Sequence, residues 1–242
     1  MVKTPLISIN GETLTPDPLG AAYWPARETL IVSDLHFEKG SSFAMRGALL
    51  PPFDTRTTLM RLEALCRRYE PKRVISLGDA FHDRGAEARI EPENAERLEA
   101  LTQAADWLWI LGNHDPEPPA RFAGASMDAV EIGSLSFQHE PSPGKAPGEI
   151  AGHLHPCARV ITEGRSLRRR CFAVGGGRMI MPALGAYTGG LNVLDEAFAP
   201  LFGGLVAWVI GAEGVYPVAT RHLAADGGGR VSHASRFARR SA

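Results

Sequence analysis

Histidine and acidic side chains gather at five points of this 242-residue sequence, each directly after a short apolar run. Imidazole, carboxylate and amide donors without a thiolate suit Mn²⁺, Fe or Zn²⁺ rather than a soft metal. The five groups therefore predict a metal site built from strand ends. They are Asp34 and His36 after residues 30–32, Asp79 after 74–77, Asn113 and His114 after 108–111, His139 after 135–137, and His153 and His155 after 149–151.

The number of these donors predicts two metal ions rather than one. A catalytic metal takes about three or four protein ligands and leaves room for water, so this set is in excess. Two ions about 3.5–4 Å apart, bridged by a carboxylate, account for the surplus. Asp79 stands alone after its strand, behind Gly78, which permits a close backbone approach. Asp79 is therefore the expected bridge.

Each motif has an ordinary explanation when it is taken alone. Asp-x-His and Gly-Asp are common at helix caps and turns, and the sequence at 112–115 fits a glycine-initiated turn. Asp34 and His36 are expected in an extended segment, and His153 and His155 on a core strand, so that each pair points to one side. All five groups in one chain favour metal binding over independent turns.

Hydrophobic periodicity predicts an α/β fold with mixed sheet pairing. Asp54 is the expected N-cap of one helix, and a second helix is expected to begin near Pro92 and to bury Leu98 and Leu101. Strand–helix alternation implies parallel strands, whereas shorter spacings after Leu111 favour hairpins. Because parallel strands end at one edge of a sheet, the five groups are expected to converge. The first helix is expected to present Leu59, Leu62, Leu65, Cys66 and Tyr69 on one face.

The composition excludes several classes of protein. With 44% apolar and 22% charged residues, the chain is expected to be globular. A net charge of −1 gives no surface-wide attraction for nucleic acid or an anionic membrane, so any nucleic-acid contact requires a local patch. Three cysteines without CxxC spacing fit neither a disulfide framework nor a zinc finger, which favours a cytoplasmic location.

One domain is expected over residues 1–220. The longest apolar stretch, 197–212, is shorter than the roughly 18 residues of a membrane helix and is interrupted by Pro200, so it favours a buried strand over 205–210. Beyond residue 220 the composition changes to Gly, Ser, Ala and Arg. We therefore expect residues 221–242 to form a flexible basic tail.

In chain order, the five groups resemble the signature of the calcineurin-like metallophosphoesterases over residues 34–155. The resemblance implies an α/β four-layer sandwich, in which two mixed β-sheets are flanked by helices and hold two divalent metals at the strand ends. It also implies phosphoester hydrolysis by a hydroxide that bridges the metals. The matching motifs are Asp34-x-His36, Gly78-Asp79, Gly112-Asn113-His114-Asp115, His139 and Gly152-His153-Leu154-His155.

The same resemblance implies roles for individual residues. His114 corresponds to the histidine that contacts substrate or protonates the leaving oxygen, and Asn113 is expected beside it. One metal is implied on Asp34, His36, Asp79 and His155, and the other on Asp79, Asn113, His139 and His153.

Two further residues, Asp115 and Arg84, each have two possible interpretations. Asp115 either orients His114 by accepting its second ring proton or is a turn residue. Related phosphoprotein phosphatases have Gly-Asp-x-Val-Asp-Arg-Gly, whereas this chain inserts His82 into the corresponding string, 78–85. Arg84 therefore either binds the substrate phosphate or is a solvated surface residue.

Longer strings at 34–40, 78–83 and 182–190 resemble the ligase-associated DNA damage response endonucleases, a bacterial branch of the same superfamily. This narrower resemblance implies a phosphodiesterase that uses Mn²⁺, with Fe, Zn²⁺ or Ni²⁺ as other candidates. It further implies DNA as substrate and an ATP-dependent DNA ligase, a helicase and an exonuclease as partners in the same repair system.

Three functions remain in competition at this point. The leading hypothesis is a nuclease, with Arg165, Arg168, Arg169 and Arg170 on a hairpin near the site as phosphate contacts, although such a run also fits a solvated turn. The second is a phosphoesterase that acts on a nucleotide or another small metabolite. The third is a noncatalytic metal-binding scaffold in DNA repair.

Overall fold

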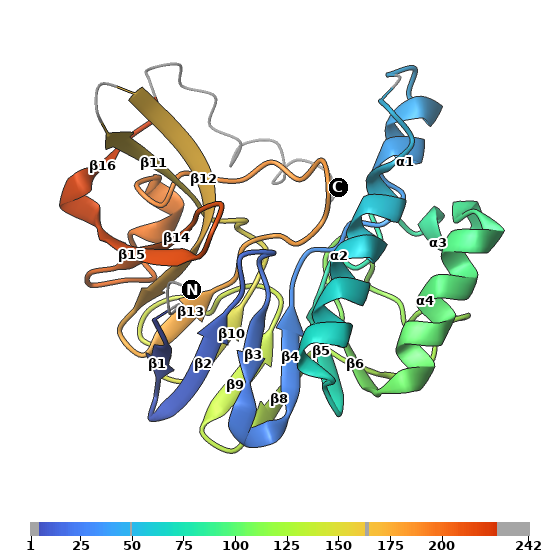
Figure 1. Ribbon diagram of the computed structural model, residues 1–242, viewed down its shortest axis with the longest axis horizontal. Helices are drawn as coiled ribbons and strands as arrows, with labels where there is room; N and C mark the ends of the chain where they lie inside the picture. Colours follow the sequence, from blue (N-terminus) through green and yellow to red (C-terminus); the bar gives the residue numbers. More distant parts are fainter. Residues whose placement is uncertain (1–4, 49, 163–164, 227–242) are drawn as a thin grey trace, which may run out of the picture.

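Two β-sheets packed face to face form the centre of the molecule (Figure 1). The computed structural model describes residues 5–48, 50–162 and 165–226. Within these ranges the first sheet has seven strands, of which the first four pair antiparallel and β4 to β7 pair in parallel. They are β1 (Ile7–Ile9), β2 (Glu12–Pro16), β3 (Ala22–Trp24), β4 (Thr29–Val32), β5 (Arg73–Leu77), β6 (Asp106–Ile110) and β7 (Ala125–Met127).

The second sheet is also mixed. Its order is β15-β14-β12-β13-β10-β9-β8, with β11 between β12 and β16. β9 and β10 pair in parallel, so the expected hairpin is wrong there: residues 139–148 return the chain to the starting edge of the sheet instead of turning it directly back. The strands are β8 (Ala129–Ile132), β9 (Leu135–Gln138), β10 (Glu149–Ala151), β11 (Cys157–Thr162), β12 (Arg165–Gly175), β13 (Arg178–Ile180), β14 (Val206–Ile210), β15 (Val215–Ala219) and β16 (Leu223–Ala224).

The described α-helices lie on the side of the first sheet (Figure 1). Both expected long helices are present, but Asp54 is the first residue of its helix rather than the N-cap, and its carboxylate accepts a hydrogen bond from the Gly40 amide at 2.9 Å. In the described part of the chain, no helix is long and apolar enough to cross a membrane. The helices are α1 (Lys39–Met45), α2 (Asp54–Tyr69), α3 (Ala86–Arg89) and α4 (Pro92–Ala104), with short 3-10 turns η1 (Pro25–Arg27), η2 (Glu196–Phe198) and η3 (Thr220–His222).

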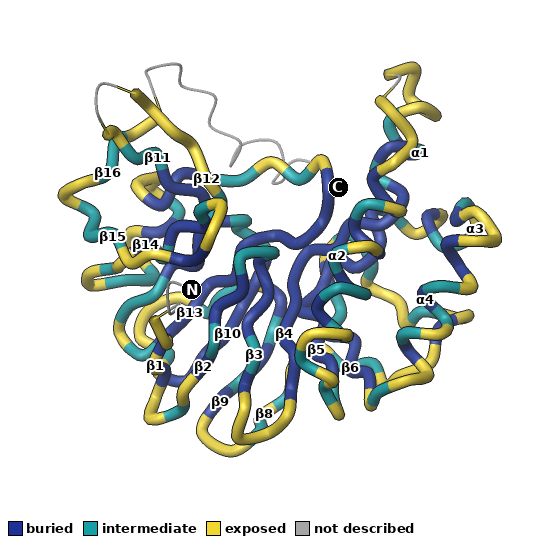
Figure 2. The backbone as a smooth tube through the Cα atoms, in the orientation of Figure 1, coloured by how far each residue is buried: buried dark blue, intermediate teal, exposed yellow. Residues whose placement is uncertain are grey.

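Three clusters of buried apolar side chains hold these layers together. Figure 2 shows in dark blue that the central strands are largely buried. Leu62 and Leu98 pack α2 and α4 onto the first sheet. Trp24 and Phe137 belong to the cluster between the two sheets. Phe198 of η2 belongs to a third cluster with residues of β12 and β14, on the outside of the second sheet. The predicted α/β class, with two mixed sheets flanked by helices, is confirmed.

The last described residues correct the expected domain boundary. Leu223 and Ala224 form β16, which pairs with β11, so residues 221–226 belong to the folded domain. The rest of the expected tail, 227–242, lies outside the described residues. The strand expected over 205–210 is confirmed as β14.

Substitution of Leu62 tests the packing of α2. Leu62 is fully buried, whereas Met60, two positions earlier on the same helix, is 56% exposed. We expect Leu62→Ala to lower the free energy of unfolding by about 2–5 kcal/mol, because it removes buried methyl groups and leaves a cavity. Met60→Ala should change it by less than about 0.5 kcal/mol. Urea unfolding of both variants measures the difference, and equal losses would contradict this packing.

Candidate metal centre

The five polar groups converge at the carboxyl ends of β4, β5, β6, β9 and β10, as the sequence predicts. Their donor atoms form two sets, the first from Asp34, His36 and His155 and the second from Asp79, His139 and His153. Within each set the donor atoms lie within 4.8 Å of one another. In the first set, His155 Nε2 lies 3.0 Å from Asp34 Oδ1 and 3.3 Å from His36 Nε2. In the second set, His139 Nε2 lies 3.4 Å from Asp79 Oδ2 and 3.1 Å from His153 Nδ1.

Asp79 lies between the two sets. Its Oδ2 atom is 3.9 Å from His36 Nε2 on one side and 3.4 Å from His139 Nε2 on the other. Asn113 joins the second set, since its Oδ1 atom is 3.0 Å from His139 Nε2. The structure thus brings the residues of each implied ligand set together and places Asp79 between the two sets, while their binding of metal remains a prediction.

The backbone at these residues is left-handed rather than extended. Asp34 and His36 have φ of 51° and 45°, His153 and His155 have 68° and 46°, and Asp79 has 48°. Residues with a Cβ rarely adopt this backbone region, and such strain concentrates at functional sites. The expectation of an extended Asp34 segment and of a histidine pair on a core strand is therefore wrong. Asp34 and His36 still contribute to one set, whereas His153 and His155 contribute to different sets.

Two glycines in the motifs are required by close backbone approach. A Cβ on Gly78, which has φ of 70°, would lie 2.3 Å from the Nδ1 atom of His139. A Cβ on Gly112 would lie 2.3 Å from both the backbone nitrogen and the Oδ1 atom of Asp79. Each Gly thus makes room for a donor from another strand end.

The surroundings of the site keep its carboxylates ionised and two of its imidazoles neutral, which are the forms that bind a metal. Burial alone would raise the pKa of Asp34 and Asp79, but the neighbouring histidines hold both below the usual range. Burial lowers the pKa of His36 and His153, so both rings are neutral at pH 7 and can bind a metal. For His139, the bond to Asp79 and the nearby carboxylates outweigh burial and raise the pKa to about 9, so a metal bound there would have to displace a proton.

The donor chemistry fits divalent cations. Ionised carboxylates, neutral imidazoles and an amide oxygen are gathered from separate strand ends, and several of them are almost wholly buried. The same set is poorly suited to a soft metal, because none of the donors is a thiolate.

His114 lies beside the two sets. Its backbone nitrogen donates to Asp79 Oδ1 at 2.9 Å, and its Nδ1 atom lies 2.8 Å from the carbonyl oxygen of His82. The Nε2 atom is 4.0 Å from Asp79 Oδ2, and 30% of the side chain is exposed. The ring is therefore fixed at one nitrogen and open to a ligand at the other.

Asp115 does not orient His114, contrary to one of its two readings. Its carboxylate accepts hydrogen bonds from the backbone nitrogens of Phe81 at 3.0 Å and Gly112 at 3.2 Å. Burial, together with the Asp79 charge, raises its pKa to about 7. Asp115 thus ties two loops together, and the carbonyl of His82 takes over the orienting role.

His82 is a site residue to which sequence reasoning assigned no role. Its Nδ1 atom is 3.4 Å from that of His36, and its ring stacks on His114 at 5.0 Å between centroids. It also belongs to a third donor group, with His36 and His114. The signal was its position three residues after Asp79, in the same strand-end loop.

The candidate arginines fall into different environments. Arg84 is 72% exposed and pairs with Glu117 at 3.3 Å, so substrate contact remains a prediction. The arginine run lies on the predicted hairpin, β11–β12, but neighbouring residues point to opposite faces. Arg170 bonds to the carbonyl oxygens of Ala183 at 2.6 Å and Leu19 at 3.2 Å, which is a structural role.

Comparison with known proteins finds one family model and several solved structures that are similar to this chain. A family model described as calcineurin-like phosphoesterase matches residues 28–181. The Pseudomonas putida nuclease MPE is similar over 89% of this chain and 100% of its own, with 29% identity and a TM-score of 0.69. The E. coli phosphoesterase Yfce is 15% identical, with coverage of 79% and 98% and a TM-score of 0.40. No curated protein sequence matches the chain significantly.

Substitution of Asp79 tests the shared position. We expect Asp79→Asn to lose metal from both donor sets, because the carboxylate between them loses its charge. Glu140→Gln is the matched control: Glu140 lies 4.0 Å from His153 Nε2, but its side chain is 65% exposed and belongs to neither set. Metal content per chain, measured by mass spectrometry after dialysis, reports the result. Wild-type content in Asp79→Asn would refute the bridging assignment.

Proposed function

The chain belongs to the calcineurin-like phosphoesterase family, and on this basis we propose that it is a dinuclear phosphodiesterase that cleaves nucleic acid in bacterial DNA repair. The coarser activity, metal-dependent hydrolysis of phosphoester bonds, follows from the family itself. The observation that carries the proposal is the pair of donor sets that meet at Asp79, with the open side of His114 beside them.

The three strings of the narrower resemblance support the choice of nucleic acid, because all three meet at the site. The 34–40 string bonds to the 78–83 string through the amides of His36 and Phe37, at 2.9 and 2.8 Å. The 182–190 string bonds to the first through the Gly185 amide and the Asp34 carbonyl, at 3.1 Å. The similarity to the P. putida nuclease, at 29% identity, points the same way.

The chain's own residues would divide the chemistry as follows. Two bound divalent cations would neutralise the phosphoryl oxygens and lower the pKa of a water molecule. The two donor sets would hold them, and Asn113, which contacts His139, would also bind the substrate. Because Nδ1 of His114 is engaged by the His82 carbonyl, Nε2 is the atom that delivers a proton to the leaving oxygen.

The metal and the partners belong to the same proposal. We favour Mn²⁺, since the donor set contains only nitrogen and oxygen and the narrower resemblance implies this ion. An ATP-dependent DNA ligase, a helicase and an exonuclease are the proposed companions in repair, and they rest on that resemblance alone.

His114→Ala should separate catalysis from metal binding. We expect metal content near that of the wild type and a turnover lower by roughly 10²–10⁴-fold, the usual contribution of a general acid. Metal analysis and steady-state kinetics on the same preparation measure both quantities. Loss of metal with proportional loss of rate would instead make His114 a ligand.

A substrate panel tests the proposed function. Metal-free protein is loaded with Mn²⁺, Mg²⁺, Zn²⁺ or Ni²⁺ and assayed on p-nitrophenyl phosphate, bis(p-nitrophenyl) phosphate, and single- and double-stranded DNA. We expect Mn²⁺ to support cleavage of the diester and of DNA. Activity on the monoester alone would favour a small-molecule phosphoesterase, and bound metal without any hydrolysis would favour the scaffold.

A further inference from the structure

Two arginines near the candidate metal centre, Arg159 and Arg168, both contact the carboxylate of Asp226. Arg159 contacts Asp226 Oδ1 through Nε and Nη2, both at 2.9 Å. Arg168 contacts the other carboxylate oxygen, Oδ2, through Nε at 3.2 Å. Asn192 also donates to Oδ1, at 3.3 Å. The carboxylate is thus held by two guanidinium groups at once.

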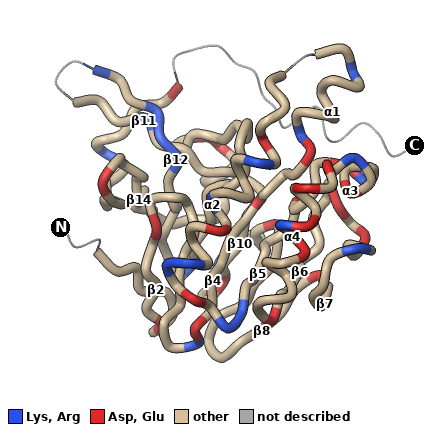
Figure 3. Tube along the Cα trace, turned by 45° about the vertical axis from the view of Figure 1, so that its right-hand side comes forward, with Lys and Arg blue, Asp and Glu red and all other residues tan. Residues whose placement is uncertain are grey.

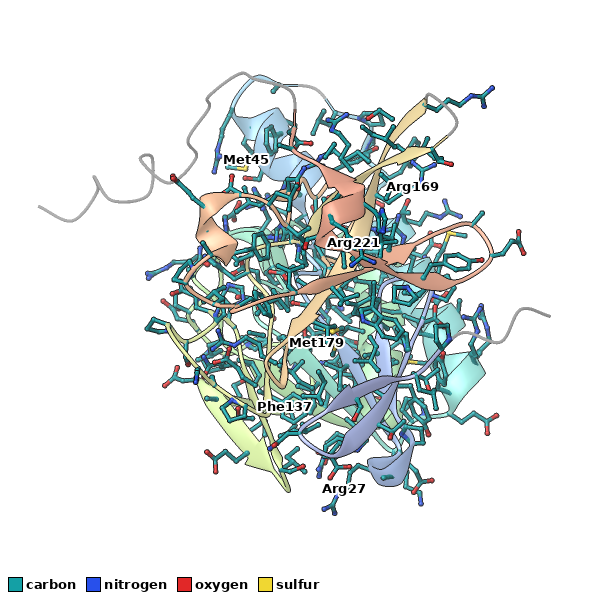
Figure 4. The ribbon with its side chains drawn as sticks, turned by 90° about the vertical axis from the view of Figure 1, so that its left-hand side faces the viewer. Arg27, Met45, Phe137, Arg169, Met179 and Arg221 are labelled. Atoms are coloured by element: carbon teal, nitrogen blue, oxygen red, sulfur yellow. The ribbon has the colours of Figure 1, made fainter. Side chains whose placement is uncertain are left out.

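Strand register creates this pair. Arg159 of β11 and Arg168 of β12 are direct partners in the antiparallel ladder, so their side chains lie on the same face. Arg169, which Figure 4 labels, is the next residue of β12. Because side chains alternate along a strand, it lies on the opposite face of the hairpin. Basic residues colour much of β11 and β12 in Figure 3, but only one face contains the pair.

The arginine face is one loop away from the metal ligands. Arg168 Nη2 donates to the carbonyl oxygen of Gly190. Gly190 packs directly on His155, because a Cβ there would lie 2.1 Å from the His155 carbonyl oxygen. β11 itself begins two residues after His155. The pair therefore borders the metal centre on its His155 side.

We propose that Arg159 and Arg168 bind a phosphate of the nucleic-acid strand other than the one being cleaved, and that Asp226 occupies this position when no nucleic acid is bound. A guanidinium group binds the oxygens of a carboxylate and of a phosphodiester in the same way. The Asp226 side chain is 42% exposed, so an anion from solvent reaches the arginines and competes with it. The inference rests on the proposed nuclease function.

A purely structural role for Asp226 predicts the opposite behaviour. In that case the ion pair only fastens β16, and its loss weakens the domain. The structure gives β16 other attachments, since Asn192 Nδ2 donates to the Ala224 carbonyl at 2.9 Å and β16 pairs with β11. Removal of the Asp226 charge therefore discriminates between a competitor and a fastener.

The experiment compares four variants of the full chain in Mn²⁺. Arg159→Gln and Arg168→Gln should each lower the ratio of DNA cleavage to bis(p-nitrophenyl) phosphate turnover by roughly tenfold, because a charge-assisted contact is lost. Asp226→Asn should raise DNA cleavage about two- to fivefold at low salt, because the competing charge is gone. Arg169→Gln, the control on the opposite face, should leave the ratio unchanged.

Binding of a labelled DNA strand, followed by anisotropy at several salt concentrations, provides the second readout. Because the two arginines share one phosphate, each substitution should reduce the slope of log affinity against log salt by less than the roughly 0.7–0.9 of one whole phosphate contact. Melting temperatures of all variants show whether the fold is intact.

The outcomes separate this inference from the function on which it rests. If Asp226→Asn lowers DNA cleavage together with the melting temperature, Asp226 is a fastener and the inference is wrong. If the wild type cleaves DNA and the arginine variants match it, the inference fails while the nuclease function stands. If the wild type binds DNA through the two arginines but does not cleave it, the nuclease function fails and the phosphate site stands. If the wild type neither binds nor cleaves DNA, both fail.

Discussion

The pairing of two buried carboxylates, Asp34 and Asp79, with the imidazoles around them is the interaction on which the functional edge depends. A buried carboxylate is costly unless charges or hydrogen bonds compensate it. Asp34 is wholly buried and receives contacts from Ser33, His155 and the His153 amide. Burial keeps two of the imidazoles neutral, so the protein alone compensates these charges only in part. Divalent cations would complete the compensation, which would couple metal binding to the stability of this edge.

This electrostatic requirement explains the irregular backbone. Donors from five strand ends have to face common points, and five of the residues that carry them, namely Asp34, His36, Asp79, His153 and His155, have left-handed backbone there. This conformation costs about 1–3 kcal/mol for each strained residue. Backbone hydrogen bonds between loops hold them in place, as in the bond from the Asp34 amide to the Gly78 carbonyl at 3.3 Å. The packed sheets behind the loops provide a rigid support for the strain.

The sequence predicted which candidate ligands come together better than it predicted the backbone that presents them. Apolar runs followed by polar residues mark parallel strand ends, and that rule alone places Asp34, Asp79 and Asn113 at one edge. It does not reveal the parallel pairing of β9 with β10 or the left-handed conformations, because both depend on contacts between distant segments. Asp115 shows the same limit: its partners are backbone amides of other loop positions, one of them Phe81, which no local pattern indicates.

Charge segregation connects the local chemistry with the neutral composition. A chain with a net charge of −1 attracts a polyanion only where its positive groups are separated from its negative ones. The described ion pairs, such as Arg97 with Glu63 and Arg73 with Asp106, cancel much of the surface charge in place. On the face of β11–β12 beside the centre, Arg159 and Arg168 share the single carboxylate of Asp226. One positive charge is thus left over next to a centre that divalent cations would make positive as well. A phosphate backbone would then meet the same sign of charge at the reacting bond and along the strand that leads away from it.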